Sequence, residues 1–369
     1  MENSRKERTS NIELLRILMM LVIVAHHYIV NSGITTYIAS ENAYNIFSKF
    51  NTYFAYLYGS GGKIAINVFL LITGYYSCKK KIKYKKIIFF ILQVLFYRWI
   101  IYLIFYLSGY EAFSLKEFVK VCLEIPYLLG KGFTSSYIVL FLLIPYLNLF
   151  IENISKKDLQ KLIGLLLIVF SIVPSISFNT FFEYIGWYVT VYFIGSYIRL
   201  YPCEYMTNKN KISLFCVITV LASWISIVIL IYMSCKFNRH LPIYWFVMDS
   251  NKIMAILTAT SLFILFLNID IGSKKIINII ASSTFGVLLI HANSDTMRRW
   301  LWQDVCQNVR FFQSDKFVIH AIIFTITVYF VCVCIDLLRK LLVNLFMKVY
   351  NTINIRLLHK SIYIGDKNV

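Results

Sequence analysis

The sequence NIELLRILMMLVIVAHHYIVNSG, residues 11–33, decides the fold of this chain. It supplies the roughly 20 mainly apolar residues that a helix needs to cross the ~30 Å hydrocarbon core of a bilayer. Yet it also contains Glu13, Arg16, His26 and His27. Ionisable side chains cost about 2.5–3.5 kcal/mol each at the centre of a membrane helix, so they usually face a protein interior or a water-filled cavity. The stretch therefore predicts a membrane helix with one polar face.

The composition extends this interpretation to the whole chain. Of the 369 residues, 59% are hydrophobic and 15% are charged, whereas soluble domains have about 45–50% apolar and about 25% charged residues. Backbone polar groups in lipid must be satisfied within each segment, and the apolar segments here are too long and too continuous for barrel strands. The sequence thus predicts an all-α polytopic transmembrane helical bundle with about ten spans: 12–31, 64–78, 87–108, 134–151, 160–178, 184–200, 212–234, 250–268, 277–293 and 317–338.

The net charge of +19 is better explained by membrane topology than by a nucleic-acid partner. If both termini lie inside, the cytoplasmic segments hold most of the 37 Lys and Arg residues, as the positive-inside rule requires. An excess of positive charge on the cytoplasmic side also suits the anionic lipids of the inner leaflet. The densest cluster, KKKIKYKK at 79–86, directly follows the second predicted span. We therefore predict an N-in, C-in orientation and no binding of nucleic acid.

No long extramembrane region divides the chain, so we expect one membrane domain over residues 1–369, with its spans within 12–338. The basic tail, 341–369, alternates apolar and charged residues, which favours the cytoplasmic membrane surface. The glycine cluster GSGG at 59–62 lacks the spacing of a phosphate loop and is interpreted as a flexible entry to the second span. The eight cysteines are scattered without CxxC or zinc-ligand spacing, so no metal site is predicted.

Helical geometry selects two of the ionisable residues in the first span. A helix advances ~100° and ~1.5 Å per residue, so Arg16 and His27 lie on nearly one face about 16 Å apart, and His26 points about 80° away. Glu13 precedes Arg16 by three residues and can pair with it. Either this face looks into the bundle, or Arg16 extends to the inner interface while the histidines lie in the outer headgroup zone. The first helix alone does not separate these alternatives.

A second histidine is predicted at the same depth. The segment STFGVLLIHANSD, 283–295, runs from inside to outside, which places His291 level with His27 and Asp295 one turn further on. Histidine acts as a general base near neutral pH, whereas an interfacial histidine is the structural alternative. Arg16, the cation toward the cytoplasmic end of the first span, suits an anionic donor molecule that enters from the cytoplasm. Arg98, near the middle of the third span, is expected to face protein or water, and its role is left open.

These residues also carry a family resemblance. The pattern N-I-E-L-L-R, followed by ten residues and a histidine, resembles the opening of integral-membrane acyltransferase family 3, whose bacterial members O-acetylate cell-surface sugars. The family's arginine and histidine fall on Arg16 and His27. The resemblance extends over about residues 11–340 and continues in NVFLLITGYY (67–76), SSYIVLFLLIPYLN (135–148), YIGWYVTVYFIGSYI (184–198) and FGVLLIH (285–291).

The resemblance implies a membrane O-acyltransferase of the bacterial cytoplasmic membrane. Such an enzyme moves an acyl group, usually acetyl from cytoplasmic acetyl-CoA, onto a hydroxyl of a cell-surface glycan or its lipid-linked precursor, with no bound cofactor. Two features depart from the family pattern. The basic motif after the second span has Lys83, Lys85 and Lys86 where arginines are usual, and Gly132-Phe133 stands where Trp-Phe is frequent. Lysine lacks the bidentate fork of arginine.

The resulting hypothesis assigns the site residues as follows. Arg16, with Lys85 and Lys86, holds acyl-CoA at the cytoplasmic mouth, and His27, beside His26, either activates the acceptor hydroxyl or transiently carries the acyl group. His291 and Asp295 line the acceptor side. A transporter or flippase of sugars or lipid-linked oligosaccharides is the alternative, because it would use the same buried charges for passage alone. A glycan polymerase ordinarily needs a larger external loop than 32–63, and a membrane scaffold leaves the polar face unexplained.

Overall fold

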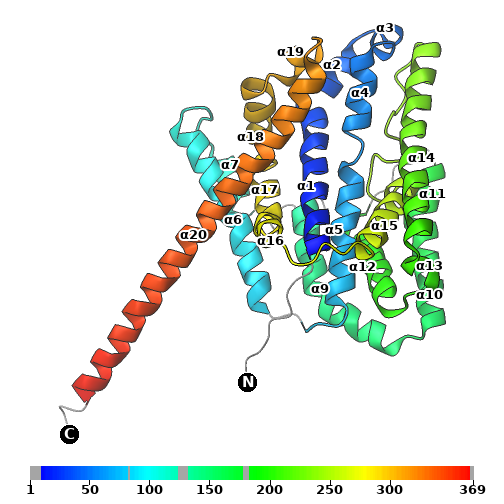
Figure 1. Ribbon diagram of the computed structural model, residues 1–369. Coiled ribbons are helices and arrows are strands. Elements are labelled where there is room, and N and C mark those ends of the chain that lie inside the picture. Colours follow the sequence, from blue (N-terminus) through cyan, green and yellow to red (C-terminus); the bar gives the residue numbers. More distant parts are fainter. Residues whose placement is uncertain (1–9, 82–83, 124–131, 178–182, 366–369) are drawn as a thin grey trace.

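The computed structural model describes residues 10–81, 84–123, 132–177 and 183–365. Within these ranges the chain forms helices joined by turns and contains no strand (Figure 1). Seven helical segments are long and apolar enough to cross a membrane, and a pair bent by 96° makes eight if it is counted as one span. The predicted all-α polytopic helical bundle is confirmed.

The long helices run in chain order through the bundle. They are α1 (Ser10–Val30), α5 (Gly62–Ser77), α6 (Tyr84–Leu107), α9 (Phe133–Asn153), α10 (Lys156–Leu167), α12 (Tyr184–Leu200), α14 (Lys209–Lys236), α15 (Ile253–Leu267) and α20 (Phe317–Gly365). Helix α10 continues through a π-helical turn, η1 (Ile168–Ile172), into α11 (Val173–Ile176). Shorter elements connect them: α2 (Ile34–Ser40), α3 (Ala43–Phe47), α4 (Phe50–Tyr58), α7 (Leu115–Cys122), α13 (Glu204–Thr207), α16 (Lys275–Ala281), α17 (Thr284–His291), α18 (Asp295–Arg299), η2 (Trp300–Val305) and α19 (Asn308–Phe312).

Helical segments lie at all ten predicted span positions, but not all are long enough for a full crossing. Helices α12 and α15 have 17 and 15 residues, fewer than the roughly 20 that span a bilayer. The predicted span 277–293 corresponds to α16 and α17, which together cover Lys275–His291 and are too short to cross alone, because the chain then bends by 96° into α18 and η2. The number of full crossings therefore stays a prediction.

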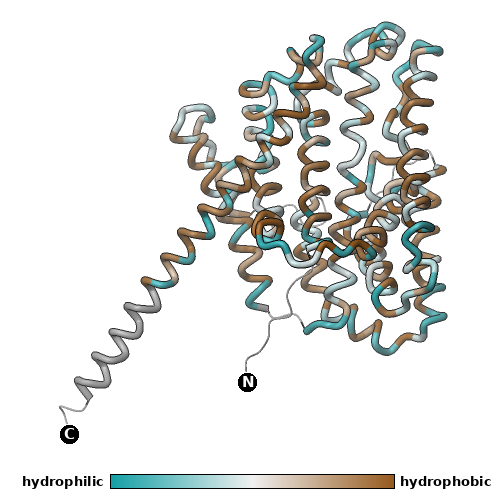
Figure 2. Tube along the Cα trace, viewed as in Figure 1, coloured by the Kyte–Doolittle hydropathy of each residue, from teal (hydrophilic) through white to brown (hydrophobic). Residues whose placement is uncertain are grey.

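Helices α1 and α5 form the centre of the bundle. Leu15, Val24 and Tyr28 of α1 are fully buried, and α1 contacts α5, α16, α17 and α20. The peripheral helices α6, α14 and α20 instead expose many large apolar side chains, which appear as brown stretches in Figure 2. An exposed apolar surface of this extent is typical of a face that lipid covers.

Small and polar side chains hold the central helices together. A Cβ on Gly74 of α5 would overlap the carbonyl oxygen of Tyr192 in α12, and one on Gly195 would overlap the carbonyl of Leu71, so the two backbones approach closely only because both positions are glycine. The buried Tyr192 hydroxyl donates to Asn148 Oδ1 of α9 at 2.6 Å. Helices α5, α9 and α12 thus form one packed unit.

The glycine cluster at 59–62 packs tightly instead of forming the expected flexible entry. A Cβ on Gly61 would overlap Val22 of α1, and one on Gly62 would overlap the ring of His26. These glycines let the start of α5 press against α1. Their role is close packing beside the two adjacent histidines.

The first helix begins and the last helix ends on the same side of the bundle (Figure 1). Helix α20 has 49 residues and continues without interruption to Gly365, so the predicted tail, 341–369, forms a helical extension as far as the structure describes it. Its location on the cytoplasmic membrane surface stays a prediction, as does the N-in, C-in orientation.

Candidate active site

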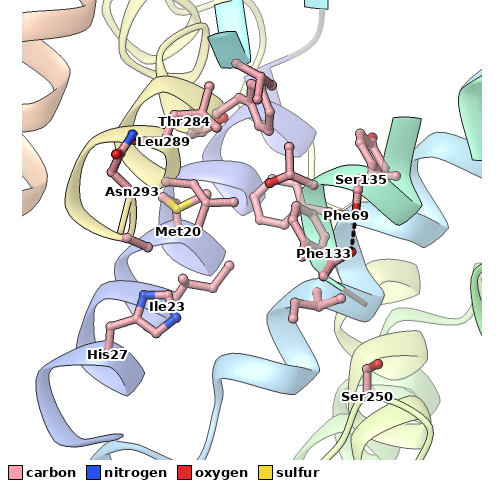
Figure 3. Close-up of a pocket in the computed structure, with 18 of the residues that line it drawn as sticks. Met20, Ile23, His27, Phe69, Phe133, Ser135, Ser250, Thr284, Leu289 and Asn293 are labelled. Atoms are coloured by element: carbon pink, nitrogen blue, oxygen red, sulfur yellow. Dashed lines mark hydrogen bonds between the residues drawn. The ribbon is translucent and has the colours of Figure 1, made fainter. Parts of the chain in front are cut away.

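A cavity of about 560 Å³ lies between α1, α5, α6, α9 and α17. Helix α1 contributes Arg16, Met20, Ile23 and His27, whose spacing of three and four residues is that of one helix face. Asn31, directly after the helix, continues this row. In Figure 3, Met20, Ile23 and His27 face Phe69 and Phe133 across the cavity. Leu289 of α17 and Asn293, which follows that helix, lie beside them. Arg16 and His27 therefore line one continuous space. We call its two ends the Arg16 end and the His27 end.

At the His27 end, two histidines from distant helices contact each other. His27 Nδ1 lies 2.9 Å from His291 Nε2, and His291 Nδ1 lies 2.6 Å from the carbonyl oxygen of Val287. A carbonyl only accepts, so in neutral rings His291 Nδ1 carries the proton and its Nε2 accepts one from His27 Nδ1. Nε2 of His27 is then unprotonated and holds a lone pair. His291 is fully buried behind it, so the predicted equal depth of the two histidines corresponds to a direct contact.

At the Arg16 end, the guanidinium is only partly neutralised. Arg16 Nη1 lies 3.5 Å from Glu13 Oε2, which confirms the predicted pair, and the Arg16 side chain is 34% exposed. Its Nε is buried without a hydrogen-bond partner within the described ranges. Because Arg16 lines the cavity, its remaining donors are available to an anionic group there.

Aromatic rings line the cavity between its two ends. Phe285 precedes His291 by six residues on α17, about 9 Å along the helix axis. Its ring stacks on Phe90 of α6 at 4.4 Å between centroids, and Phe69 and Phe133 also line the cavity. Within this layer the Tyr137 and Thr73 hydroxyls, 2.6 Å apart, hydrogen-bond each other. The cavity is thus polar at both ends and mainly apolar between them.

Five of the predicted site residues do not line the cavity: His26, Lys85, Lys86, His291 and Asp295. His291 instead lies behind His27 and contacts it there. His26 Nδ1 lies 2.6 Å from the carbonyl oxygen of Gly59, so its ring faces the start of α5, as the 80° offset predicts. Lys85 and Lys86 are exposed at the start of α6, and Lys85 lies 5.9 Å from the ring of Phe89. The neighbouring Lys83 lies outside the described residues.

Asp295 does not line the cavity, whose acceptor side it was predicted to line together with His291. Its carboxylate is 97% exposed and lies 2.9 Å from Arg298 Nη1. The expectation assumed a continuous helix, whereas α17 ends at His291 and the chain turns by 96° before α18. Asp295 therefore lies on a different helix axis from His291.

The sequence alone did not reveal two cations of the His27 end. Lys63 of α5 and Arg298 of α18 line the cavity together with Arg98, whose role was open. Arg98 Nη1 donates to the carbonyl oxygen of Asn293, two residues after His291. Little in the sequence indicated that these two residues belong to the site. Lys63 directly follows the glycine cluster at 59–62, and Arg298 lies seven residues after His291.

Among the described residues, no cluster of three or more His, Cys, Asp or Glu side chains is arranged to hold a metal ion. In the comparison with known families, the acyltransferase domain of acyltransferase family 3 matches residues 9–337. No curated protein and no solved structure matches the chain.

Proposed function

The chain belongs to acyltransferase family 3, and from this membership we propose that it is an O-acetyltransferase. It is a multi-pass membrane protein of an acyltransferase family. In our proposal it transfers acetyl from cytoplasmic acetyl-CoA to a hydroxyl of a cell-surface glycan or its lipid-linked precursor, in a bacterial cytoplasmic membrane. The observation that carries the proposal is the single cavity lined by Arg16 at one end and His27 at the other.

The donor fits the chemistry of the cavity along its length. The phosphates of acetyl-CoA are anionic and match the Arg16 end, where the guanidinium keeps unused donors. The pantetheine arm is uncharged, with two amides and a hydroxyl on an aliphatic chain. It fits the layer of Phe69, Phe90 and Phe285, which also contains the Thr73 and Tyr137 hydroxyls. Arg16 and His27 are about 16 Å apart along α1, so phosphates bound at one end present the thioester near the other. Lys85 and Lys86 are exposed on the N-terminal side of Phe90 in α6 and in this proposal only attract the donor.

His27 then supplies the base. Its Nε2 accepts the proton of the acceptor hydroxyl while that oxygen attacks the thioester carbonyl, and the resulting oxyanion collapses by breaking the carbon–sulfur bond. The CoA thiolate leaves and takes up the proton from His27, which restores the neutral ring. His291 Nε2 stabilises the transient His27 imidazolium through the 2.9 Å contact with Nδ1.

The same lone pair on Nε2 also suits the alternative in which His27 carries the acetyl group covalently. In that case Nε2 attacks the thioester first, CoA leaves, and the acceptor hydroxyl takes the acetyl group in a second step. Incubation with acetyl-CoA in the absence of acceptor separates the two routes. An acetylated His27 peptide in mass spectrometry identifies the carrier route, and its absence with unimpaired transfer identifies the general base.

The test of the proposed function is mass spectrometry of surface glycans from cells with and without the protein. We expect a gain of one acetyl per modified sugar, and a loss of about 10²–10⁴-fold in transfer rate in His27→Ala. Arg16→Ala should raise the KM for acetyl-CoA. The control is His240→Ala, which removes an exposed histidine whose Nε2 contacts the carbonyl of Glu41. Full acetylation by His27→Ala at normal protein level contradicts the proposal, as does sugar movement without acetyl-CoA consumption.

A further inference from the structure

The His27 end of the cavity carries more positive charge than the proposed reaction uses. Lys63, Arg98 and Arg298 line it from three different elements, α5, α6 and α18, and the described lining residues include no Asp or Glu. Lys63 and Arg298 both act electrostatically on His27. The positive charge is therefore concentrated where the acceptor hydroxyl must lie.

Lys63 gives the clearest evidence for the kind of group that this cluster binds. Its ammonium forms no hydrogen bond or ion pair with any residue that the structure describes, and only Asp249, which does not line the cavity, attracts it. An ammonium group partly enclosed in a cavity is costly unless an opposite charge or hydrogen-bond acceptors compensate it. A lysine lining this cavity thus favours an anion as its partner.

Arg298 has unused hydrogen-bonding capacity in the same place. Its Nη1 bonds Asp295, but that carboxylate is 97% exposed, and an exposed pair is weakened by water and salt. Its Nε is buried without a hydrogen-bond partner within the described ranges. Arg98, which donates to the Asn293 carbonyl, adds a third positive charge. Guanidinium groups bind carboxylate and phosphate with paired, charge-assisted hydrogen bonds.

We propose that the acceptor is anionic and that Lys63, Arg98 and Arg298 bind its carboxylate or phosphate beside the reacting hydroxyl. This inference rests on the proposed function and adds the chemical class of the acceptor. The anion comes either from the glycan, as the carboxylate of an acidic sugar, or from its lipid carrier, as a phosphate. In both cases the cations fix the acceptor in register with His27 Nε2.

The experiment uses the full-length protein in lipid nanodiscs and measures kcat and KM for two matched acceptor pairs. One pair is a uronic-acid oligosaccharide and its form reduced to the neutral sugar. The other is a sugar on a polyprenyl diphosphate and the same sugar on an uncharged polyprenyl chain. We expect kcat/KM to favour the anionic member of at least one pair by about tenfold or more, because charge-assisted hydrogen bonds are lost with the neutral member. The pair that shows the preference identifies the source of the anion.

Substitutions connect the preference to the three cations. Lys63→Gln and Arg298→Gln should raise the KM for the anionic acceptor about tenfold and leave the KM for acetyl-CoA unchanged, while Arg298→Lys retains part of the preference. Arg239→Gln, which removes an exposed cation outside the cavity, should change neither constant.

Equal kcat/KM for both members of both pairs overturns the inference. So does a rise in the KM for acetyl-CoA alone, because the cations would then bind the donor. If the proposed function itself is wrong, no acceptor leads to release of CoA, which is a different result. That outcome overturns the inference as well.

Discussion

The contact between His27 and His291 gives a direction to proton movement at the scale of single residues. Val287 accepts from His291 Nδ1 at 2.6 Å, and this fixes which nitrogen of each neutral ring holds a proton. In many hydrolases a carboxylate orients the catalytic histidine in this way. A second neutral histidine here serves as a weaker acceptor, which avoids placing another formal charge in the membrane interior.

His291→Ala should lower kcat more than it changes KM. The substitution leaves the Nδ1–H group of His27 buried without its acceptor, at a cost of about 1–3 kcal/mol. Without His291, no residue that the structure describes holds His27 in the tautomer that has its lone pair on Nε2. We expect a fall of about ten- to a hundredfold in kcat, corresponding to about 1.4–2.8 kcal/mol, with an unchanged KM for acetyl-CoA. Steady-state kinetics of the purified protein check this, and an unaltered kcat would assign His291 a purely structural role.

Gly62→Ala should destabilise the protein at the contact between α1 and α5. The added Cβ would overlap the His26 ring, and overpacking of this kind costs about 1–3 kcal/mol. The matched control is Gly164→Ala in α10, where a Cβ meets nothing within 4 Å and helix propensity favours alanine. Thermal unfolding in detergent should show a lower midpoint for the first variant only. Equal midpoints would mean that α5 shifts without cost.

Helical periodicity predicted the site well where the helix is continuous and poorly where it ends. Arg16 and His27 share the cavity because α1 runs unbroken from Ser10 to Val30. The prediction placed Asp295 wrongly because α17 ends at His291. No glycine or proline marks this break in the sequence. One signal was available: the Ser294 side chain accepts from Met297 N, so it is the N-cap of α18, and a serine before an acidic residue is typical of a helix start.

At the scale of whole elements, a buried carboxylate joins α6, α17 and α20. Asp336 of α20 is fully buried, accepts from Tyr97 OH of α6 at 2.8 Å, and lies 2.9 Å from both Arg339 and Lys340. Gly286 of α17 makes room for it, because a Cβ there would overlap the carboxylate. This arrangement fixes the helix that presents His291.

Asp336→Asn should therefore loosen that helix. Removing one partner of a buried ion pair leaves charges uncompensated and typically costs about 3–5 kcal/mol, so we expect a clearly lower unfolding temperature and reduced activity. Asp158→Asn removes an exposed carboxylate that pairs with Lys161 and should leave the unfolding temperature nearly unchanged. Similar midpoints for the two variants would show that Asp336 contributes little to stability.

At the scale of the whole molecule, the composition was sufficient to predict the fold class but not the cavity. Long apolar segments require helices in lipid whatever their partners. The cavity instead depends on how five helices far apart in the sequence pack, and no local pattern of Lys63, Arg98 or Arg298 shows that they meet. The sequence also left open whether the polar face of α1 looks inward; the packing of α1 at the centre of the bundle answers this.

The separation of the two ends predicts a sided reaction. The phosphates of acetyl-CoA should enter only at the Arg16 end, which the predicted orientation places at the cytoplasm. We expect acetyl-CoA added outside sealed inside-out vesicles to support transfer, and the same addition to right-side-out vesicles to support none. Radiolabelled acetyl-CoA measures both, and a detergent-permeabilised sample provides the control. Equal labelling of the two intact preparations would contradict the orientation or the donor path.

The stacked rings of Phe90 and Phe285 between the two polar ends have an electrical consequence. A water-filled pore joining the two faces would let protons and other ions leak and would discharge the membrane potential. Because these apolar rings line the cavity between its polar ends, a hydrated ion finds few polar groups there to replace its water shell. The acyl group can thus be passed on with little ionic current. The same apolar lining that accommodates the donor's arm therefore also limits the loss of membrane potential through the protein.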